Sequence, residues 1–83
     1  MLIQSGRLKT MDLAYAYSRR GLSNLVLHQL ARAIQDFDEE IKLTPNDAEP
    51  FWMRSVIEKR LGNIAAANAD KAKACAHDPK YCD

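Results

Sequence analysis

Three side chains that commonly bind metal ions lie close together near the C-terminus: Cys75, His77 and Cys82, in the stretch "CAHDPKYC". Thiolate and imidazole groups at this spacing are possible zinc ligands. Only these three candidates lie together, however, because the other histidine, His28, is far away in the sequence. Two alternatives involve the cysteines alone. A helix stop at Pro79 would let the tail fold back and form a disulfide, which requires an oxidising compartment. Otherwise both cysteines are free thiols, the alternative that the sequence favours.

A second group of side chains that could bind a ligand is the acidic run Asp36, Asp38, Glu39 and Glu40. Such a run suggests a metal ion or a basic partner. On a helix, however, these side chains fan around more than one face, so they do not converge on one ion. We therefore predict that the run forms a solvated outer face.

The chain carries no set of residues typical of catalysis. It has no nucleophile with an adjacent base, no glycine-rich phosphate loop and no paired carboxylates in a plausible cleft. The formal net charge is only +1, and no basic stripe alternates with aromatic residues. We therefore expect no enzyme activity, no cofactor, no bound metal and no nucleic-acid or membrane partner.

The sequence also gives an expectation about location. Its longest apolar runs, such as "LVL" and "IAAA", are far shorter than the ~18 residues of a membrane span. The N-terminal stretch "MLIQSGRLKTMDL" lacks the continuous apolar block of a secretory signal. A cytoplasmic location is the default expectation.

The elements that position these residues are predicted to be helices only. Three glycines and three prolines punctuate the chain, good helix formers dominate it, and no segment alternates with period two. Gly62 and Asn63 predict one tight turn; His28 and Gln29 predict another, because histidine tolerates a left-handed backbone better than most residues. The expected helices span residues 11–27, 30–43, 47–61 and 64–77.

The chain repeats itself with a period of 34 residues. Residues 14–47 match residues 48–81 at seven identical positions, among them Arg20 with Arg54, Asp36 with Asp70, and Pro45 with Pro79. A self-match at this period indicates stacked helix–turn–helix units.

The two units resemble tetratricopeptide repeats. The resemblance rests on "YSRRG" and "RAIQDFDEEIKLTPN" in the first unit, and on "LGNIAAANAD" and "AKACAHDP" in the second. Small residues stand where the family packs its two helices closest, namely Gly21 with Ala33 and Ser55 with Ala67. The second unit departs from the pattern at Ser55, where the family has glycine, and at Lys71, which replaces the aromatic Phe37.

This resemblance implies an all-α fold of two antiparallel helix pairs, stacked as a short right-handed superhelix. The expected organisation is an N-terminal extension or cap (residues 1–13), a first repeat (14–47) and a second repeat (48–81), together forming one domain.

The resemblance also implies a function, because the first helix of each repeat in this family builds an inner surface that binds peptides. The matching positions here form the predicted partner-binding set: Tyr15, Ser18, Arg19, Leu22, Val26, Glu49, Trp52, Met53, Val56 and Arg60. Some family members clamp a terminal carboxylate with lysine and asparagine on this surface. The first-unit positions are Ser18 and Leu22 here, so we expect no such clamp. For Trp52 the sequence leaves two roles open, contact with a partner or cover for a small core.

The charged residues that recur in both units also predict contacts, independently of the family resemblance. In an antiparallel hairpin, residues equidistant from the turn lie side by side. We therefore predict two ion pairs, Arg20–Asp36 in the first unit and Arg54–Asp70 in the second. If partly exposed, each contributes about 0–1 kcal/mol.

Two repeats are few, because each unit buries its apolar faces only against its neighbours. Self-association would cover both the inner surface and the exposed end. We therefore expect a protein-interaction module that binds an unidentified protein or peptide and forms a homo-oligomer. The alternative is a self-assembling unit whose inner surface is used by its own copies.

Overall fold

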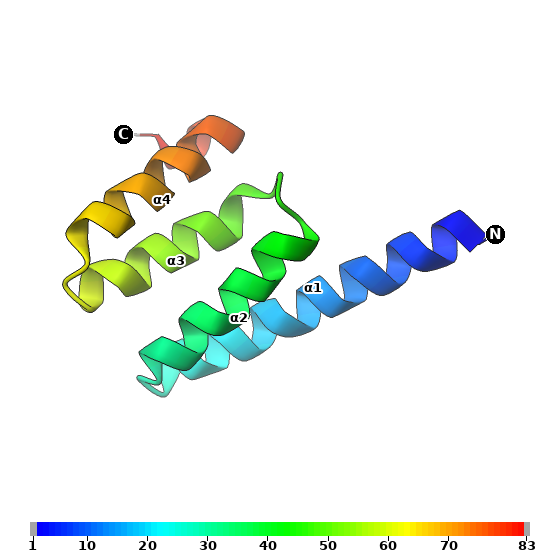
Figure 1. Cartoon of the computed structure of the whole chain (residues 1–83), viewed down its shortest axis with the longest axis horizontal. Coiled ribbons are helices and arrows are strands. Elements are labelled where there is room, and N and C mark those ends of the chain that lie inside the picture. Colours follow the sequence, from blue (N-terminus) through cyan, green and yellow to red (C-terminus); the bar gives the residue numbers. More distant parts are fainter. Residues whose placement is uncertain (1, 83) are drawn as a thin grey trace.

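The computed structural model describes residues 2–82, with side chains from Lys9 onward, and contains four α-helices joined by short turns (Figure 1). They are α1 (Leu2–Val26), α2 (Leu30–Leu43), α3 (Ala48–Arg60) and α4 (Ile64–His77), followed by the 3₁₀ turn η1 (Pro79–Tyr81). The predicted ranges 30–43 and 64–77 are confirmed without change, and the range 47–61 is shortened by one residue at each end. The first helix begins at Leu2 instead of residue 11, so the N-terminal segment continues α1.

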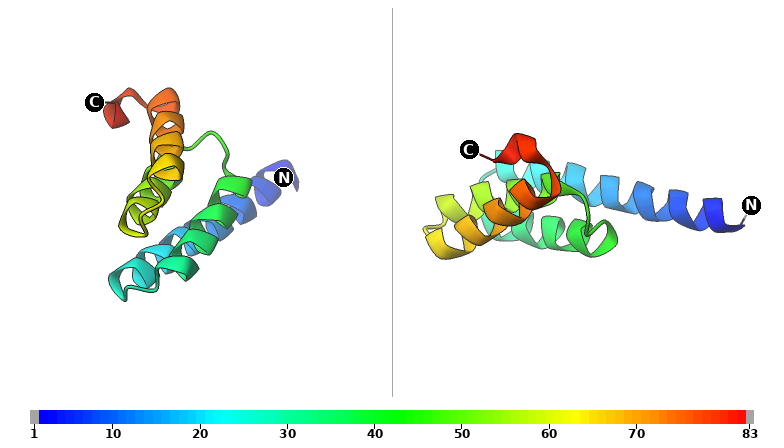
Figure 2. Two further views of the ribbon diagram at one scale, coloured as in Figure 1. Left: turned by 60° about the vertical axis from the view of Figure 1, so that its left-hand side comes forward. Right: turned by 90° about the horizontal axis from the view of Figure 1, so that it is seen from above.

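The helices form two antiparallel pairs, which confirms the predicted all-α fold of two helical hairpins. α1 packs on α2, α3 packs on α4, and α2 contacts α3. Figure 2 shows the two pairs lying side by side from two further directions, with the N-terminal turns of α1 extending beyond the other helices. None of the helices in residues 2–82 combines the length and the apolar character needed to cross a membrane.

Both hairpin turns use the same C-terminal helix cap. In the first turn, the amide of His28 donates to the carbonyl of Leu25, and the amide of Gln29 donates to that of Asn24. The second turn repeats these bonds 34 residues later, from Gly62 and Asn63. This bond pattern needs a left-handed residue. His28 has a φ of 59° and Gly62 a φ of 85°, so the predicted left-handed role of His28 is confirmed.

The core lies where α3 packs into the first hairpin. Ala33, Phe37 and Ile57 form its fully buried centre, and Met53 of α3 packs against it. Leu25, Leu30 and Ile34 complete the walls of this pocket in the first hairpin. Pro50, Met53 and Ile57 recur at spacings of three and four, so they share one face of α3.

Gly21 allows the first hairpin to close around this core. A Cβ atom at Gly21 would lie 2.9 Å from both Cε2 and Cζ of Phe37, and 3.3 Å from Cβ of Asp36. Ser55 and Lys71 occupy the equivalent positions of the second hairpin. The glycine and the aromatic ring therefore change together between the two units.

The prediction that the acidic run forms a solvated outer face is wrong. Asp36 and Glu40 are buried, with exposed fractions of 3% and 7%, while Asp38 and Glu39 are half-buried. Asp38 pairs with Arg54, and Glu39 pairs with Lys42. Asp36 faces α1 inside the hairpin, and Glu40 lies near enough to Asp47 and Glu49, at the start of α3, for their charges to act on it. The charges therefore serve the packing of the helices.

Candidate functional site

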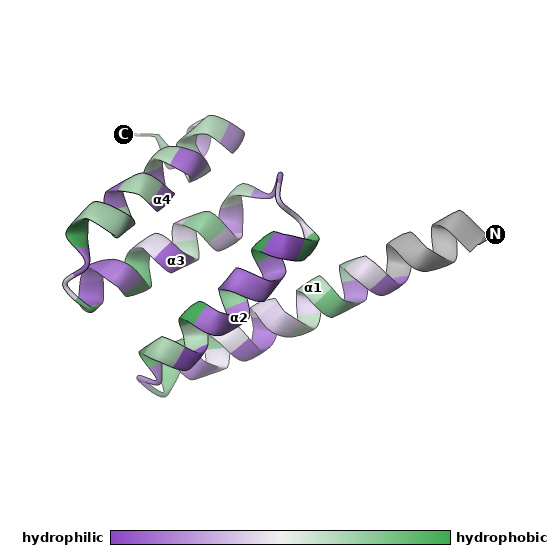
Figure 3. Ribbon diagram, in the orientation of Figure 1, coloured by the Kyte–Doolittle hydropathy of each residue, from purple (hydrophilic) through white to green (hydrophobic). Residues whose placement is uncertain are grey.

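A groove of about 600 Å³ runs between α3 and α4, and we call it the α3–α4 groove. It is lined by Trp52, Ser55, Val56, Lys59, Arg60, Ile64, Ala67, Asn68 and Lys71. Figure 3 shows hydrophobic colour in the first turns of α4 beside hydrophilic colour at the end of α3. The residues that line the groove are therefore partly apolar and partly polar.

The 34-residue repeat shows which element fills the equivalent groove of the first hairpin. Shifting Lys59, Ile64, Ala67, Asn68 and Lys71 back by 34 positions gives five residues of the first hairpin: Leu25, Leu30, Ala33, Ile34 and Phe37. These five belong to the core that receives Met53 and Ile57 of α3. The α3–α4 groove is thus the second unit's copy of a helix-binding groove. Within the described chain no further α-helix follows α4 to fill it.

The groove is lined by cations but not by carboxylates. Lys59, Arg60 and Lys71 stand among the nine lining residues, and neither Asp nor Glu is found in this set. Its apolar part comes mainly from Trp52, Val56 and Ile64, and Ile64 keeps 52% of its surface exposed.

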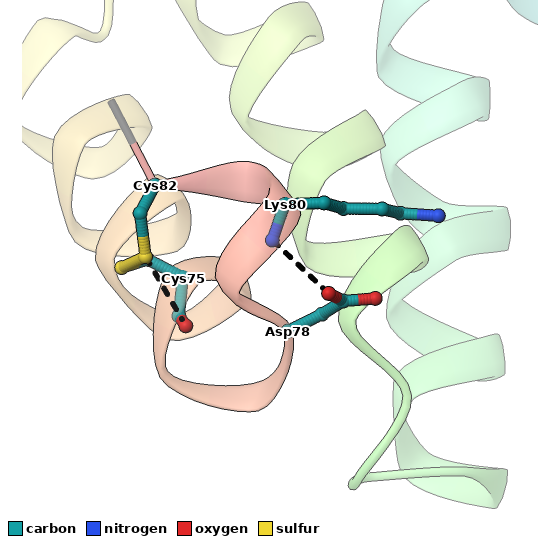
Figure 4. Close-up of a disulfide and its surroundings, with 4 residues drawn as sticks. All are labelled: Cys75, Asp78, Lys80 and Cys82. Atoms are coloured by element: carbon teal, nitrogen blue, oxygen red, sulfur yellow. Dashed lines mark hydrogen bonds between the residues drawn. A yellow bond between two sulfur atoms is a disulfide. The ribbon is translucent and has the colours of Figure 1, made fainter.

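The C-terminal turn η1 lies at one end of this groove. The ring of Tyr81 stacks on that of Trp52 with 5.5 Å between centroids. Asp78 caps η1, because its carboxylate accepts a hydrogen bond of 3.1 Å from the amide of Lys80 (Figure 4). Tyr81 also shares a second, smaller hollow with Lys71, so the tail borders the groove directly.

A disulfide joins Cys75 of α4 to Cys82 and holds this turn in place (Figure 4). The expectation of two free thiols is therefore wrong. The physical reason is that η1 reverses the chain after the helix, which brings the two Cα atoms to 4.7 Å, a separation that a disulfide can span. His77 stacks on the ring of Phe51, and among the described residues no three His, Cys, Asp or Glu side chains gather where they could hold a metal ion.

Both predicted ion pairs are confirmed. Arg20 donates from Nε and Nη2 to Oδ1 of Asp36, at 2.9 and 2.7 Å. Arg54 donates two parallel hydrogen bonds to Asp70, at 2.7 and 2.6 Å. Arg54 also donates to Asp38 of the first unit at 2.8 Å, a contact across the repeat boundary that the sequence did not predict. These bonds raise the pKa of Arg54, with Asp70 as the main cause.

A third member of each cluster differs between the units. Asn24 donates a hydrogen bond of 2.8 Å to Oδ2 of Asp36, and Glu58 occupies the equivalent position beside Asp70. Burial, followed by hydrogen bonding and repulsion from Asp70, raises the pKa of Glu58 from 4.5 to about 7. Protonated Glu58 can donate to Asp70 as Asn24 donates to Asp36. For Asp70, burial opposes ionisation, but the bonds from Arg54 and Glu58 outweigh it and lower its pKa.

Glu40 is a second buried carboxyl with a raised pKa. Burial, assisted by repulsion from Asp47 and Glu49, moves its pKa from 4.5 to about 7. One carboxyl oxygen of Glu40 and one of Glu58 are buried without a hydrogen-bond partner among the described residues. Because folding raises both pKa values, the stability they contribute is fully present below about pH 4.5 and is lost as the pH rises through about 7.

The predicted partner-binding set is divided between several places. Arg19, Leu22 and Val26 line an open hollow on α1, where Val26 is 76% exposed. Tyr15 is also exposed and accepts a hydrogen bond from Arg19, while Ser18 is half-buried. These residues form an exposed face of α1 that is separate from the α3–α4 groove.

The second-unit members of the set fall into three positions. Trp52, Val56 and Arg60 line the α3–α4 groove. Glu49 lies at the start of α3, where its amide donates to the N-cap Asp47. Met53 packs against the core and is only partly accessible.

Sequence reasoning missed the α4 wall of the groove and the tail beside it. Ile64, Asn68 and Lys71 were not included because the family resemblance directs attention to the first helix of each unit. The 34-residue shift could have found them, since their first-unit equivalents form the pocket that α3 fills. Tyr81 has no such signal, because its position depends on how η1 turns back.

Comparison with known proteins adds no further constraint: no family model matches this chain, and no solved structure matches it significantly.

Proposed function

We propose that this chain is a non-catalytic protein-interaction module of the tetratricopeptide type, which holds a helical segment of a partner in the α3–α4 groove. The single observation that supports this proposal is the equivalence of the two hairpin grooves. The first groove receives Met53 and Ile57 of α3, whereas the second leaves Ile64 and the side of Trp52 accessible.

Apolar burial supplies the driving force for such binding. Each large apolar side chain that becomes fully buried contributes about 1.5–3 kcal/mol. Val56, Ile64 and the remaining surface of Trp52 are the residues of the groove that would gain this burial. In this helix-in-groove mode, the bound helix contacts the groove through apolar residues spaced three and four apart.

The experiment that tests the proposal is a selection from a displayed library of random helical peptides, with no bias in charge. We expect peptides that bind the wild-type chain, lose binding with Val56→Asp, and keep it with Val26→Asp. Val26→Asp is the matched control, because it adds the same charge to the exposed face of α1. Loss of binding with Val26→Asp alone, or no selectable binder, would contradict the proposal.

The second candidate function is self-assembly through α1. It is favoured by the exposed apolar side chains of Met11, Leu13 and Tyr15, which keep between 48% and 63% of their surface accessible. In that case light scattering over a range of concentrations would show a dimer or larger species, and Leu13→Lys would return it to the monomer. A monomer at all concentrations would exclude this candidate.

The proposed cytoplasmic location depends on the redox state of the two cysteines. Disulfides persist in oxidising compartments and are rare in the cytoplasm, so a cytoplasmic chain would hold Cys75 and Cys82 as thiols. Trapping thiols with a maleimide at the moment of cell lysis decides between a cytoplasmic location and an oxidising compartment. Two labelled cysteines support the cytoplasm, and none supports an oxidising compartment.

A further inference from the structure

We infer that the C-terminal tail, residues 78–82, is a redox-controlled cover at one end of the α3–α4 groove. The Cys75–Cys82 disulfide keeps the tail in place, and its reduction releases the tail and opens this end of the groove to a partner helix. This inference rests on the proposed function and adds a mode of regulation for the same site. It follows from the path of the tail, from its contact with Trp52 and from the exposure of the disulfide.

The tail follows the path of the turn that joins the two hairpins. In that turn, the amide of Asp47 donates a hydrogen bond of 3.1 Å to the carbonyl of Thr44. At the equivalent positions 34 residues later, the amide of Tyr81 donates a hydrogen bond of 3.1 Å to the carbonyl of Asp78. The same backbone bond therefore turns the chain after α2 and after α4.

This equivalence gives Cys82 a defined position relative to the groove. Cys82 corresponds to Ala48, the first residue of α3, and α3 is the helix that fills the first groove. A helix that filled the second groove as α3 fills the first would begin at the place of Cys82. The tail already occupies this place, so it closes that end of the groove to a helix of the same length.

Tyr81 also covers part of Trp52, the largest apolar side chain that lines the groove. The two rings stack with 5.5 Å between their centroids. A smaller hollow continues from the groove along α4, because Asn68 and Lys71 line both. Tyr81 and Cys82 line this hollow as well. Release of the tail therefore exposes more of Trp52 and extends the groove along α4.

The disulfide is the covalent link that anchors the tail to α4 (Figure 4). The backbone bonds of η1, from Tyr81 to Asp78 and from Cys82 to Pro79, join residues of the tail to each other. They maintain the shape of η1 but do not attach it to a helix. Once the disulfide is open, the stack of Tyr81 on Trp52 remains as a noncovalent anchor, and a partner helix competes with it for the same ring.

A dithiol reductant can reach the bond, because Cys82 is exposed and Cys75 is half-buried. A thiolate of the reductant attacks the sulfur of Cys82, the S–S bond breaks, and the sulfur of Cys75 leaves as a thiolate that takes up a proton. The second thiol of the reductant then attacks the mixed disulfide and releases Cys82 as a thiol. The dithiol thus becomes a disulfide and passes two electrons and two protons to the chain.

The test measures how tightly one helical peptide binds the full chain in both redox states. The peptide comes from the same displayed library, selected against the wild-type chain in dithiothreitol, and must lose binding with Val56→Asp. Its dissociation constant is measured by fluorescence anisotropy with the oxidised chain and with the reduced chain. Circular dichroism and a thiol assay verify the fold and the redox state of each sample.

We expect the reduced chain to bind the peptide at least about threefold more tightly than the oxidised chain, because the peptide takes the place of the Tyr81 ring on Trp52. The control Cys75→Ser/Cys82→Ser should bind like the reduced wild type, with or without dithiothreitol. Tyr81→Ala keeps the disulfide, and its oxidised form should bind more tightly than the oxidised wild type.

Three outcomes would overturn the inference, and they have different meanings for the proposed function. Equal affinity of the oxidised and reduced wild-type chains, or tighter binding by the oxidised chain, removes the redox control but leaves a groove that binds helices. No gain with Tyr81→Ala has the same meaning, because the contact of the tail with Trp52 would then not limit binding. If neither redox state yields a binder from the library, the proposed function fails as well.

Discussion

The close approach of Gly21 to Phe37 gives the sharpest prediction about stability. In the variant Gly21→Ala, the new methyl group would lie 2.9 Å from two atoms of the Phe37 ring, inside the 3.5–4.0 Å optimum for carbon atoms, taken as an approximate range. Phe37 is 1% exposed and belongs to the core with Ile57. The ring therefore has no free space into which to move.

The expected magnitude is the difference between two effects. Overpacking a filled core costs about 1–3 kcal/mol, whereas replacing glycine by alanine in a helix returns about 1 kcal/mol. We expect a net loss of up to about 2 kcal/mol in the free energy of unfolding, measured by urea denaturation followed by circular dichroism. At about 4–8 °C per kcal/mol, the midpoint of thermal unfolding should fall visibly.

Two controls separate packing from helix propensity. Ser55→Ala at the equivalent position, where Lys71 replaces the ring, removes only a local bond to the carbonyl of Trp52 and should change stability by less than about 1 kcal/mol. Phe37→Leu combined with Gly21→Ala should cost less than the sum of the two single variants, because the smaller side chain leaves room. A Gly21→Ala variant more stable than wild type would refute the reasoning.

Three further predictions concern pH, a turn and the tail. Glu58→Gln keeps a hydrogen-bond donor at every pH, so it should remove part of the loss of stability, on the order of 1–3 kcal/mol, that we expect in wild type between about pH 4.5 and pH 7; an unchanged pH profile would contradict this. His28→Gly should stabilise the chain by up to about 1 kcal/mol in urea denaturation, because His28 is left-handed, and a destabilised variant would argue against that backbone. Reducing the Cys75–Cys82 bond should free η1 and make Trp52 more accessible to acrylamide without loss of helix. The variant Cys75→Ser/Cys82→Ser is the control and should not respond to the reductant. If acrylamide quenching of the wild-type chain stays unchanged on reduction, the disulfide does not hold the tail.

The sequence predicts the hairpins well because their determinants are local or repeated. The ranges 30–43 and 64–77, the left-handed His28 and both arginine–aspartate pairs follow from turn chemistry and the 34-residue period. Each of these features depends on residues within one hairpin. Short-range contacts of this kind leave a visible pattern in the sequence.

The features that the sequence did not predict depend on contacts between hairpins or on the path of the tail. Glu40 is buried and lies near Asp47 and Glu49 at the start of α3, and no pattern within the acidic run indicates this. Arg54 reaches Asp38 only because the two units are stacked. The disulfide depends on η1 turning back toward α4. The location of the groove was available from the repeat, because its walls match Leu25, Leu30 and Phe37 of the filled first groove.

The central claim is that the α3–α4 groove, and not the exposed face of α1, is the binding site. The most direct test is an NMR titration of the isotope-labelled chain with a helical peptide selected from the displayed library, following the backbone amides. We predict that the shifts gather at Val56, Lys59, Ile64 and Lys71 and leave Val26 unchanged. Shifts confined to the α1 face around Val26 would contradict the account.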